Sequence, residues 1–521
     1  MRAFLLLTSV LIALYQQVNS EKILLLNAAR IGQSHVFFMG KIADVLAEAG
    51  YNVTFYQQDA FTSVTKVGAK KAKVIVRPCE LGCRDQPVEN VWAHGDELLD
   101  NSEMMRTFGT TMGEACESQL KDDSLTDMLR AQNYELVIAE HFDYCAYAIA
   151  DKAGIKKVIT ASAIMIQPPI LEQLGNPTNL AFTPGMDDDH GSEMTYYQRA
   201  KAFLMYPVKR LFMRTLFEGY VIDAIHKFYK PDFDVAEAIA KSSYVFVNVD
   251  EHLAFQQPLS EKFVYIGGVG EHMGRDHVLP ENINKIMKNS KKGVVLISFG
   301  TIAQSYLLSE ETKQEFIEVF KAFPEHDFIW KYEVDDDIAA NLSNVHKMKW
   351  TPQSDLLAHP KLVAFITHGG LNSMSETAHK GKPFVCIPLF GDQNHDCFSA
   401  QEKGLAVMIE KSEMTKENLA HALKIVLQES YQKRALEFAK MMANKPFQPK
   451  DRIIGFVKHA LKHDVSTALD LPGRQLNIIQ YYFIDVIVPI VIIAAIFMYS
   501  SYRTAKAVVV YLRSFAKVKA E

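Results

Sequence analysis

The chain has 521 residues, of which 48% are apolar and 22% charged, and its formal net charge is -5. This composition excludes a disordered chain, and the length suggests two or three domains rather than one. The net charge disfavours a nucleic-acid partner, which would require a strongly basic face. Residues 503–521 hold five Lys/Arg and one acidic residue, whereas residues 21–502 hold 50 basic and 60 acidic residues. An acidic body with a basic tail points to a membrane.

Residues 1–20 have the pattern of a secretory signal peptide. Arg2 precedes an apolar run from Phe4 to Leu14, and the small residue Ser20 closes the segment. The apolar run is too short to span a membrane comfortably, and the alternative is a buried first strand.

The first half of the body alternates strand-like and helical segments. Apolar spacing predicts a helix over residues 35–49 that ends at Gly50, and helical stretches such as 195–217. The less regular stretch 168–256 is interpreted as an elaboration of the same domain. Short apolar runs predict strands at 22–27, 53–56, 74–76, 136–139, 157–160 and 243–249.

A glycine-containing linker at residues 266–290 precedes a second alternation of strands and helices. Helices are predicted over 310–323 and from Asn372. Repeated βα units imply two open parallel sheets, hence two Rossmann-like α/β domains that face a cleft at the carboxyl ends of their strands. The predicted strands are 293–299, 328–332, 345–349, 362–367, 384–387 and 406–409.

Residues 481–502 predict a transmembrane helix. They contain one charge, Asp485, and tyrosines at both edges, and 22 residues cross roughly 30 Å of hydrocarbon as a helix. The basic residues that follow predict a cytoplasmic tail, so the body would lie on the lumenal or extracellular side. The predicted division is 1–20 signal peptide, 21–265 N-terminal domain, 266–290 linker, 291–455 C-terminal domain, 456–480 C-terminal helix and membrane approach, 481–502 span and 503–521 tail.

The six cysteines would then lie in an oxidising compartment. The predicted disulfide joins Cys79 and Cys83, in a loop with Pro and Gly, and the other four cysteines are expected to be buried thiols: Cys116, Cys145, Cys386 and Cys397. Two glycosylation sequons occur, at Asn52 and Asn341. The acidic runs 187–189 and 335–337 are interpreted as solvated loop charge, and no metal site is predicted.

The stretch from Trp350 to Gln393 contains most of the candidate ligand-binding residues. Residues 365–373 read as a strand, a glycine turn and a helix start, which offers backbone N–H groups to an anion, with His368 and Ser373 as further donors. A diphosphate fits this set better than a carboxylate. The alternative is that Ser373 and Glu376 form only a capping box. Trp350, at a strand end, would stack on a base or pack in the core.

These residues resemble the 44-residue signature of UDP-glycosyltransferases, and the chain is most similar to the membrane-anchored UDP-glucuronosyltransferases. Similarity extends to residues 194–199, 265–268 and 295–301. The resemblance implies a GT-B fold in which the C-terminal domain binds the UDP-sugar and the N-terminal domain binds the acceptor. It implies that Trp350 stacks on uracil and that Gly370 gives backbone access. The other implied contacts are Gln353 and Glu376 with ribose, Thr301, His368, Asn372 and Ser373 with the diphosphate, and Asp392 and Gln393 with the sugar.

His35 is the candidate catalytic base. It lies at the start of a predicted helix, where the helix dipole disfavours the cation, so its pKa is expected to fall. A neutral imidazole beside a strand end can deprotonate a hydroxyl. A lone histidine is more often structural, but the family places its base here. The family's partner aspartate aligns with Glu140, and Asp143 is the alternative partner.

The sequence therefore predicts an inverting, metal-independent transfer from a UDP-sugar, with UDP-glucuronate favoured, to a hydroxyl of a small lipophilic acceptor. No cofactor is required, because the UDP-sugar is the donor substrate. The expected place is the endoplasmic reticulum membrane, as a type I protein and a possible homo-oligomer. The alternatives are UDP-glucose as donor, or a catalytically weak, membrane-anchored lipophile-binding protein.

Overall fold

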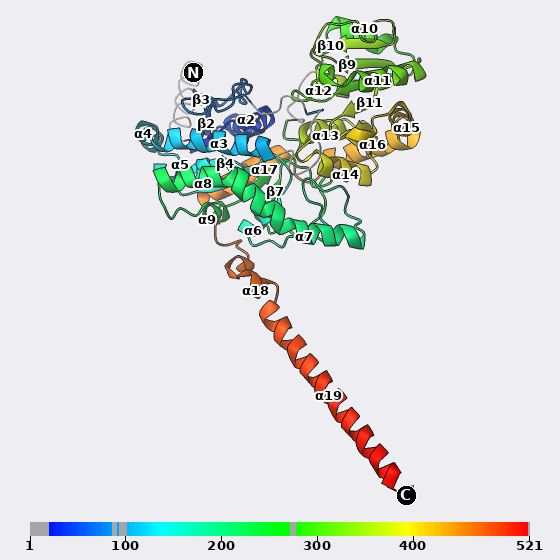
Figure 1. Ribbon diagram of the computed structural model, residues 1–521. Coiled ribbons are helices and arrows are strands. Elements are labelled where there is room, and N and C mark those ends of the chain that lie inside the picture. Colours follow the sequence, from blue (N-terminus) through cyan, green and yellow to red (C-terminus); the bar gives the residue numbers. More distant parts are fainter. Residues whose placement is uncertain (1–19, 86–90, 93–101, 271–277, 519–521) are drawn as a thin grey trace.

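Two parallel sheets form the framework of the computed structural model, which describes residues 20–85, 91–92, 102–270 and 278–518 (Figure 1). The predicted signal peptide lies outside these residues except for Ser20, and so do residues 271–277 of the predicted linker. One sheet lies in an N-terminal lobe and the other in a C-terminal lobe, and the two-sheet α/β prediction is confirmed.

The N-terminal sheet has seven strands in the order β3-β2-β1-β4-β5-β6-β7, and every neighbouring pair is parallel. The chain leaves β1 toward β2 on one side and returns to β4 on the other, which opens a crevice at the carboxyl ends of β1 and β4. The strands are β1 (Lys22–Asn27), β2 (Asn52–Gln58), β3 (Lys73–Arg77), β4 (Leu136–Glu140), β5 (Val158–Ser162), β6 (Val245–Val247) and β7 (Phe263–Tyr265).

Helices cover both faces of this sheet, which explains why β1 is a continuous apolar run rather than an alternating one. Ile23 to Leu26 are completely buried. The predicted helix 35–49 begins two residues earlier, so His35 lies in its first turn. The helices are α2 (Gln33–Glu48), α3 (Ser102–Leu120), α4 (Asp123–Ala131), α5 (Tyr144–Ala153), α6 (Pro168–Gln173), α7 (Tyr196–Met213), a π-helical turn (Arg214–Glu218), α8 (Gly219–Phe228) and α9 (Val235–Ala240).

The C-terminal sheet has six parallel strands in the order β10-β9-β8-β11-β12-β13. Its crevice lies between the carboxyl ends of β8 and β11, for the same topological reason. The strands are β8 (Val294–Ser298), β9 (Asp327–Lys331), β10 (Val345–Met348), β11 (Leu362–Thr367), β12 (Phe384–Cys386) and β13 (Ala406–Met408). The helices are α10 (Glu281–Asn289), α11 (Glu310–Ala322), α12 (Gln353–Ala358), α13 (Leu371–His379), α14 (Gln393–Glu402), α15 (Lys416–Val426) and α16 (Glu429–Ala443).

The chain then crosses back to the N-terminal lobe. Helix α17 (Pro449–Lys462) buries Ile453, Val457 and Ala460 in the same apolar cluster as the β1 residues Ile23 and Leu25. Figure 1 shows α17, in orange, beside α2. The boundary predicted at residue 455 therefore falls inside a helix that packs on the first lobe.

A single long helix ends the described chain. After α18 (Ile478–Tyr481), α19 (Ile484–Val518) extends away from both lobes (Figure 1). Its apolar part, Ile484–Ser514, is long enough to cross a membrane, and the most apolar window of that segment has none of its length buried inside the protein. Helix α19 is therefore compatible with a membrane anchor. The predicted tail, as far as residue 518, continues the same helix.

Buried polar contacts fix the two lobes against each other. Asp250, just after β6, binds Lys445, just after α16, with Oδ2 and Nζ 2.7 Å apart and both side chains fully buried. Asn248 donates a hydrogen bond from Nδ2 to Oδ1 of Asn372 at 3.2 Å. These contacts hold the carboxyl edge of the N-terminal sheet against the segment after α16 and against the start of α13.

Removal of the buried Lys445 cation should destabilise the protein, whereas removal of an exposed lysine should not. Lys445→Met leaves the Asp250 carboxylate buried without its main partner, so the free energy of unfolding should fall by about 3–5 kcal/mol. Lys433→Met removes the same charge from an exposed pair with Glu437 and should change stability by less than about 0.5 kcal/mol. Denaturant titration of both variants checks the difference, and equal effects would refute the structural role of the Asp250–Lys445 pair.

Candidate active site

His35 and Glu140 meet at the carboxyl edge of the N-terminal sheet. His35 lies in the first turn of α2, and Glu140 is the last residue of β4. His35 Nδ1 is 3.2 Å from Oε1 of Glu140, and Oε2 of Glu140 accepts a hydrogen bond from the Phe142 backbone N–H at 3.0 Å. An ionised carboxylate can only accept, so Nδ1 carries the proton and Nε2 of the neutral ring keeps its lone pair.

The pKa of His35 moves opposite to the dipole-based expectation. Burial of the ring opposes protonation, but the charge of the Glu140 carboxylate and its hydrogen bond outweigh burial and raise the pKa of His35 above its ordinary value. The expected fall is therefore wrong. The reason is the carboxylate from a distant strand, which the dipole argument did not contain.

Asp143 does not contact His35 in this arrangement. Its Oδ2 accepts a hydrogen bond from the Ala29 backbone N–H at 3.0 Å. Burial, and then the nearby charge of Glu140, raise the pKa of Asp143 to about 8. Of the two candidate partners, Glu140 is the one that the fold brings to the imidazole.

The turn after β11 surrounds His368 with glycines. A Cβ atom on Gly370 would lie 2.7 Å from Nε2 of His368, and one on Gly300 would lie 2.9 Å from Cε1. Burial, and then the charge of Lys331, lower the pKa of His368 to about 4, so the ring is neutral. Thr301 is exposed and follows Gly300, directly after β8. The loops after β8 and β11 thus meet at the crevice of the C-terminal sheet.

The start of α13 is free of a side-chain cap. Gly370 is the N-cap residue, so Ser373 lies within the helix and the capping-box alternative is wrong. The first N–H groups of α13 therefore remain available to an anion. Asn372 accepts the bond from Asn248 described above, a contact from the other lobe that the sequence did not predict.

The remaining predicted donor residues lie around this helix start. Gln353, the first residue of α12, donates from Nε2 to Oγ of Ser373 at 3.1 Å and to Oε2 of Glu376 at 2.9 Å. Trp350 is 61% exposed, which excludes the alternative of core packing. Lys66 of the N-terminal lobe lies over its ring, with Nζ 4.6 Å from the centroid.

Asp392 and Gln393 lie at the start of α14. Oε1 of Gln393 accepts hydrogen bonds from the backbone N–H groups of Leu389 and Phe390, so its oxygen holds the turn and only the amide nitrogen is available. Asp392 interacts electrostatically with His35 of the other lobe. Burial raises the pKa of Asp392, and the charge of His35 opposes that rise. The predicted base and the predicted sugar-binding carboxylate, which come from different lobes, therefore influence each other's charge.

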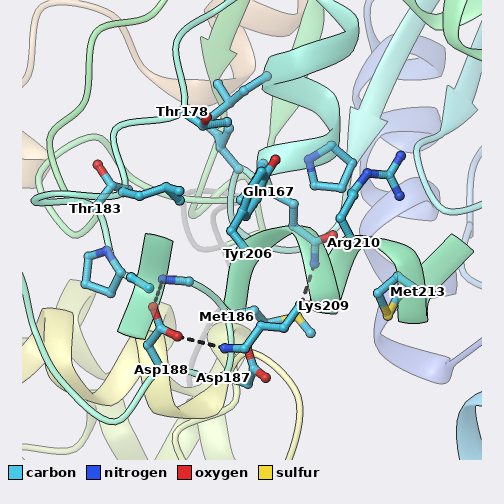
Figure 2. Close-up of a pocket in the computed structure, with 18 of the residues that line it drawn as sticks. Gln167, Thr178, Thr183, Met186, Asp187, Asp188, Tyr206, Lys209, Arg210 and Met213 are labelled. Atoms are coloured by element: carbon cyan, nitrogen blue, oxygen red, sulfur yellow. Dashed lines mark hydrogen bonds and ion pairs between the residues drawn. The ribbon is translucent and has the colours of Figure 1, made fainter. Parts of the chain in front are cut away.

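A cavity of about 130 Å³ adjoins this cleft on the N-terminal side (Figure 2). Phe142 connects the two, because it lines the cavity and its ring contacts His35 at a centroid distance of 5.8 Å. The charged groups of the wall are paired: Lys209 with Asp187 and Asp188, and Arg210 with Glu218. The run 187–189 is thus ion-paired rather than merely solvated. Apolar side chains form much of the remaining wall, among them Ile166, Leu171, Met186, Met213 and Phe217.

Comparison with known proteins gives the family. Residues 22–520 match the family UDP-glucoronosyl and UDP-glucosyl transferase. The chain belongs to this family. The putative UDP-glucuronosyltransferase ugt-48 of Caenorhabditis elegans is 29% identical over 92% of the chain and 93% of its own length. UDP-glucuronosyltransferase 3A1 of Bos taurus is 29% identical over 90% of each chain, and its Homo sapiens counterpart is 26% identical over 96% of each.

Solved glycosyltransferases share the fold of this UDP-glycosyltransferase. The glycotransferase of kitacinnamycin has a TM-score of 0.58 at 18% identity and covers 85% of this chain and all of its own. The calicheamicin glycosyltransferase CalG4 has a TM-score of 0.54 at 16% identity, over 85% of this chain and 99% of its own. The predicted GT-B fold is confirmed. The family uses UDP-sugar donors and needs no cofactor.

One cluster in the described part of this UDP-glycosyltransferase has the composition of a metal site. Asp250, Glu251 and His252 bring three possible ligand atoms together. The two carboxylates already bind Lys445 and Arg452, which neutralise them. We therefore interpret these three residues as part of the contact between the lobes rather than as a metal site.

The cysteines of this UDP-glycosyltransferase differ from the expectation. Cys79 and Cys83 form the predicted disulfide, but the other four are not free thiols: Cys116 pairs with Cys145, and Cys386 with Cys397. Apolar surroundings indicate burial but not which two buried side chains face each other. The Cys386–Cys397 bond joins β12 to α14 directly beneath Gly369 of the glycine turn.

Gly369 should tolerate no side chain. Its φ is +80°, and a Cβ atom would overlap both sulfurs of the Cys386–Cys397 bond. Gly369→Ala should therefore lower the free energy of unfolding by about 2–5 kcal/mol, from a left-handed backbone penalty of about 1–2 and overpacking of about 1–3 kcal/mol. Gly404 has φ +69° and only the Arg434 side chain nearby. Gly404→Ala should therefore show the left-handed backbone penalty without the cost of overpacking. Thermal unfolding compares them, and equal midpoints would contradict the packing argument.

Proposed function

We propose that this UDP-glycosyltransferase transfers glucuronic acid from UDP-glucuronate to a hydroxyl of a small lipophilic acceptor, with inversion at the anomeric carbon. The observation that carries the proposal is the contact that holds His35 against Glu140 at the carboxyl edge of the N-terminal sheet, an edge that Asn248 joins to the uncapped start of α13 in the opposite lobe. The names of the related UDP-glucuronosyltransferases support the choice of donor.

In the proposed reaction, Nε2 of His35 removes the proton of the acceptor hydroxyl. The acceptor oxygen forms its bond to the anomeric carbon while the bond from that carbon to the UDP oxygen breaks, and the departing electron pair stays on UDP. The Glu140 carboxylate orients the imidazole and stabilises the imidazolium that forms. The N–H groups at the start of α13 stabilise charge that develops on the diphosphate, as the transition state gains oxocarbenium character.

The donor is proposed to lie along the crevice of the C-terminal sheet. Uracil would stack on Trp350 in place of the Lys66 ammonium, and the ribose hydroxyls would join the hydrogen bonds between Gln353 and Glu376. Gly370 would let the backbone approach the diphosphate, and the sugar would lie between Asp392, the amide nitrogen of Gln393 and His35. The diphosphate would contact Thr301, His368, Asn372 and Ser373.

The cavity beside Phe142 is the proposed acceptor site. Its charges are neutralised in pairs and much of its remaining wall is apolar, so burial of an apolar molecule there is favourable at about 25 cal/mol per Å². A hydroxyl at the Phe142 end of such a molecule would point toward His35.

We further propose that α19 crosses the endoplasmic reticulum membrane as the single span of a type I protein. Residues 1–20 would direct secretion, the lobes would lie in the lumen, and the basic residues from Arg503 onward would lie in the cytosol. The disulfides fit an oxidising lumen.

Removal of the base should lower turnover strongly and leave donor binding unchanged. His35→Ala should lower kcat by about 10²–10⁴-fold, the usual contribution of general-base catalysis, with UDP affinity unchanged. His421→Ala, at an exposed position on α15, is the matched control and should be silent. Mass spectrometry with a phenolic acceptor and separate UDP-glucuronate and UDP-glucose measures this. Full turnover by His35→Ala would refute the base, preference for UDP-glucose would refute the donor, and no transfer from either would favour a lipophile-binding protein.

Glu140 variants should shift the pH dependence of the reaction. The neutral imidazole is the active form, and Glu140 raises the pKa of His35, so activity should rise as pH increases through that raised pKa. In Glu140→Gln the attraction is lost while burial remains, so the acidic limb of kcat/KM should move to lower pH and the maximal rate should fall. Glu140→Asp keeps the charge, so its limb should stay near that of the wild type.

The pH–rate profiles of the three proteins check this prediction. An acidic limb that is identical in wild type and Glu140→Gln would show that Glu140 does not set the protonation of the base.

A further inference from the structure

His141 is a buried polar side chain that the proposed reaction does not use. It follows Glu140, the last residue of β4, is 3% exposed, and lines the cavity beside Phe142. Neither of its ring nitrogens has a hydrogen-bond partner among the described residues. Buried polar groups are normally paired, because an unpaired group loses its hydrogen bonds to water without replacement. His141 is therefore a candidate to bind a molecule in the cavity.

The described neighbours of His141 do not supply the missing bonds. The ring packs edge-on against Phe142 at a centroid distance of 5.6 Å and against Tyr144 at 6.4 Å. Gln173 is close enough to influence the pKa of the ring, yet its Oε1 also lacks a partner in the described chain. One amide oxygen accepts from only one ring nitrogen, so a turn of Gln173 would still leave the other nitrogen unpaired.

The ring of His141 is neutral in these surroundings. Burial lowers the pKa of His141, although the charges of Glu140 and Glu218 oppose that effect. A neutral imidazole carries one N–H donor and one lone pair, whichever tautomer is present. A neutral oxygen group suits this ring, because it accepts the N–H bond without the cost of burying a charge.

Two more polar atoms of the cavity wall are unpaired. Oγ1 of Thr183 and Oε1 of Gln257 are buried and have no hydrogen-bond partner among the described residues. Figure 2 shows Thr183 on the wall. The charged groups of the same wall are instead paired with one another. The wall therefore combines apolar side chains with neutral polar atoms that a bound molecule can pair.

We propose that His141 determines acceptor specificity by a hydrogen bond to a second oxygen of the acceptor, a carbonyl or a hydroxyl, while the reacting hydroxyl faces His35. The proposal rests on the proposed function of the cavity as the acceptor site. Both imidazoles border the ring of Phe142, His35 at a centroid distance of 5.8 Å and His141 at 5.6 Å. One apolar molecule that passes Phe142 can therefore reach both. The preferred acceptors are then hydroxyketones and diols on apolar carbon skeletons, rather than hydrocarbons that carry a single hydroxyl.

Acceptor pairs that differ in one oxygen atom test the proposal. Acetylnaphthols and the matching isopropenylnaphthols have the same shape and one reacting hydroxyl, but only the ketone has a carbonyl oxygen to accept the bond. Each pair is prepared with the substituent at three different ring positions. Dissociation constants are measured by calorimetry on the full-length protein with UDP present, so this readout needs no turnover.

The wild type should bind the ketone more tightly than the alkene in at least one pair. His141→Phe should reduce that preference by about 3–10-fold, which is the worth of a neutral hydrogen bond. His141→Gln keeps a neutral donor and should retain the preference. His226→Phe is the matched control, because Nε2 of His226 already lies 3.1 Å from the backbone oxygen of Phe233 on another part of the lobe, and it should not change the preference.

Equal binding of ketone and alkene by the wild type in all three pairs, or no binding, overturns the proposal, and this comparison requires no variant to fold. A preference that persists in His141→Phe also overturns it and would assign the contact to another group, such as Thr183 or Gln257. Turnover of the same acceptors is measured separately, and His141→Phe should raise KM for the ketone more than it lowers kcat. Absence of transfer with the binding preference intact would refute the proposed function and support the role of His141.

Discussion

The parallel arrangement of both sheets is the constraint on which the site depends. In a parallel sheet every strand ends at the same edge, so the loops that follow the strands gather there. In each lobe the topology opens this edge between the first strand and a later one, β1 and β4 in one lobe, β8 and β11 in the other. The contacts of Asp250 and Asn248 turn the two edges toward each other. The proposed base on one lobe and the proposed anion-binding helix start on the other are thereby placed on edges that face each other.

Electrostatics within this cleft are set by groups from distant parts of the chain. His35 and His368 are both buried imidazoles, yet their pKa values move in opposite directions. The difference is the neighbour, since Glu140 favours the protonated form of His35 and Lys331 disfavours that of His368. Two identical side chains are thus suited to the different tasks proposed for them, proton transfer in one lobe and neutral hydrogen bonding in the other.

The proposed acceptor side is built from the least regular part of the sequence. Residues 166–218 contribute most of the cavity wall, and their charged side chains pair with one another, Lys209 with Asp187 and Asp188, and Arg210 with Glu218. No short motif marks such a wall, because its apolar character arises from which side chains face inward. By contrast, the proposed donor side is almost continuous in sequence, so a single stretch contains most of the residues proposed for it.

The sequence by itself determined the six strands of the C-terminal sheet, six of the seven strands of the N-terminal sheet, the glycine turn after β11 and the long apolar segment at the end of the chain. These features follow from local periodicity and from residue types at fixed spacing, which need no knowledge of the rest of the chain. Only the tertiary structure decided that Glu140 rather than Asp143 meets His35, that the pKa of His35 rises, that Cys116 and Cys386 are paired, and that α17 returns to the first lobe. Each of these depends on the distance between segments separated by many residues, and that distance is fixed by packing rather than by local pattern.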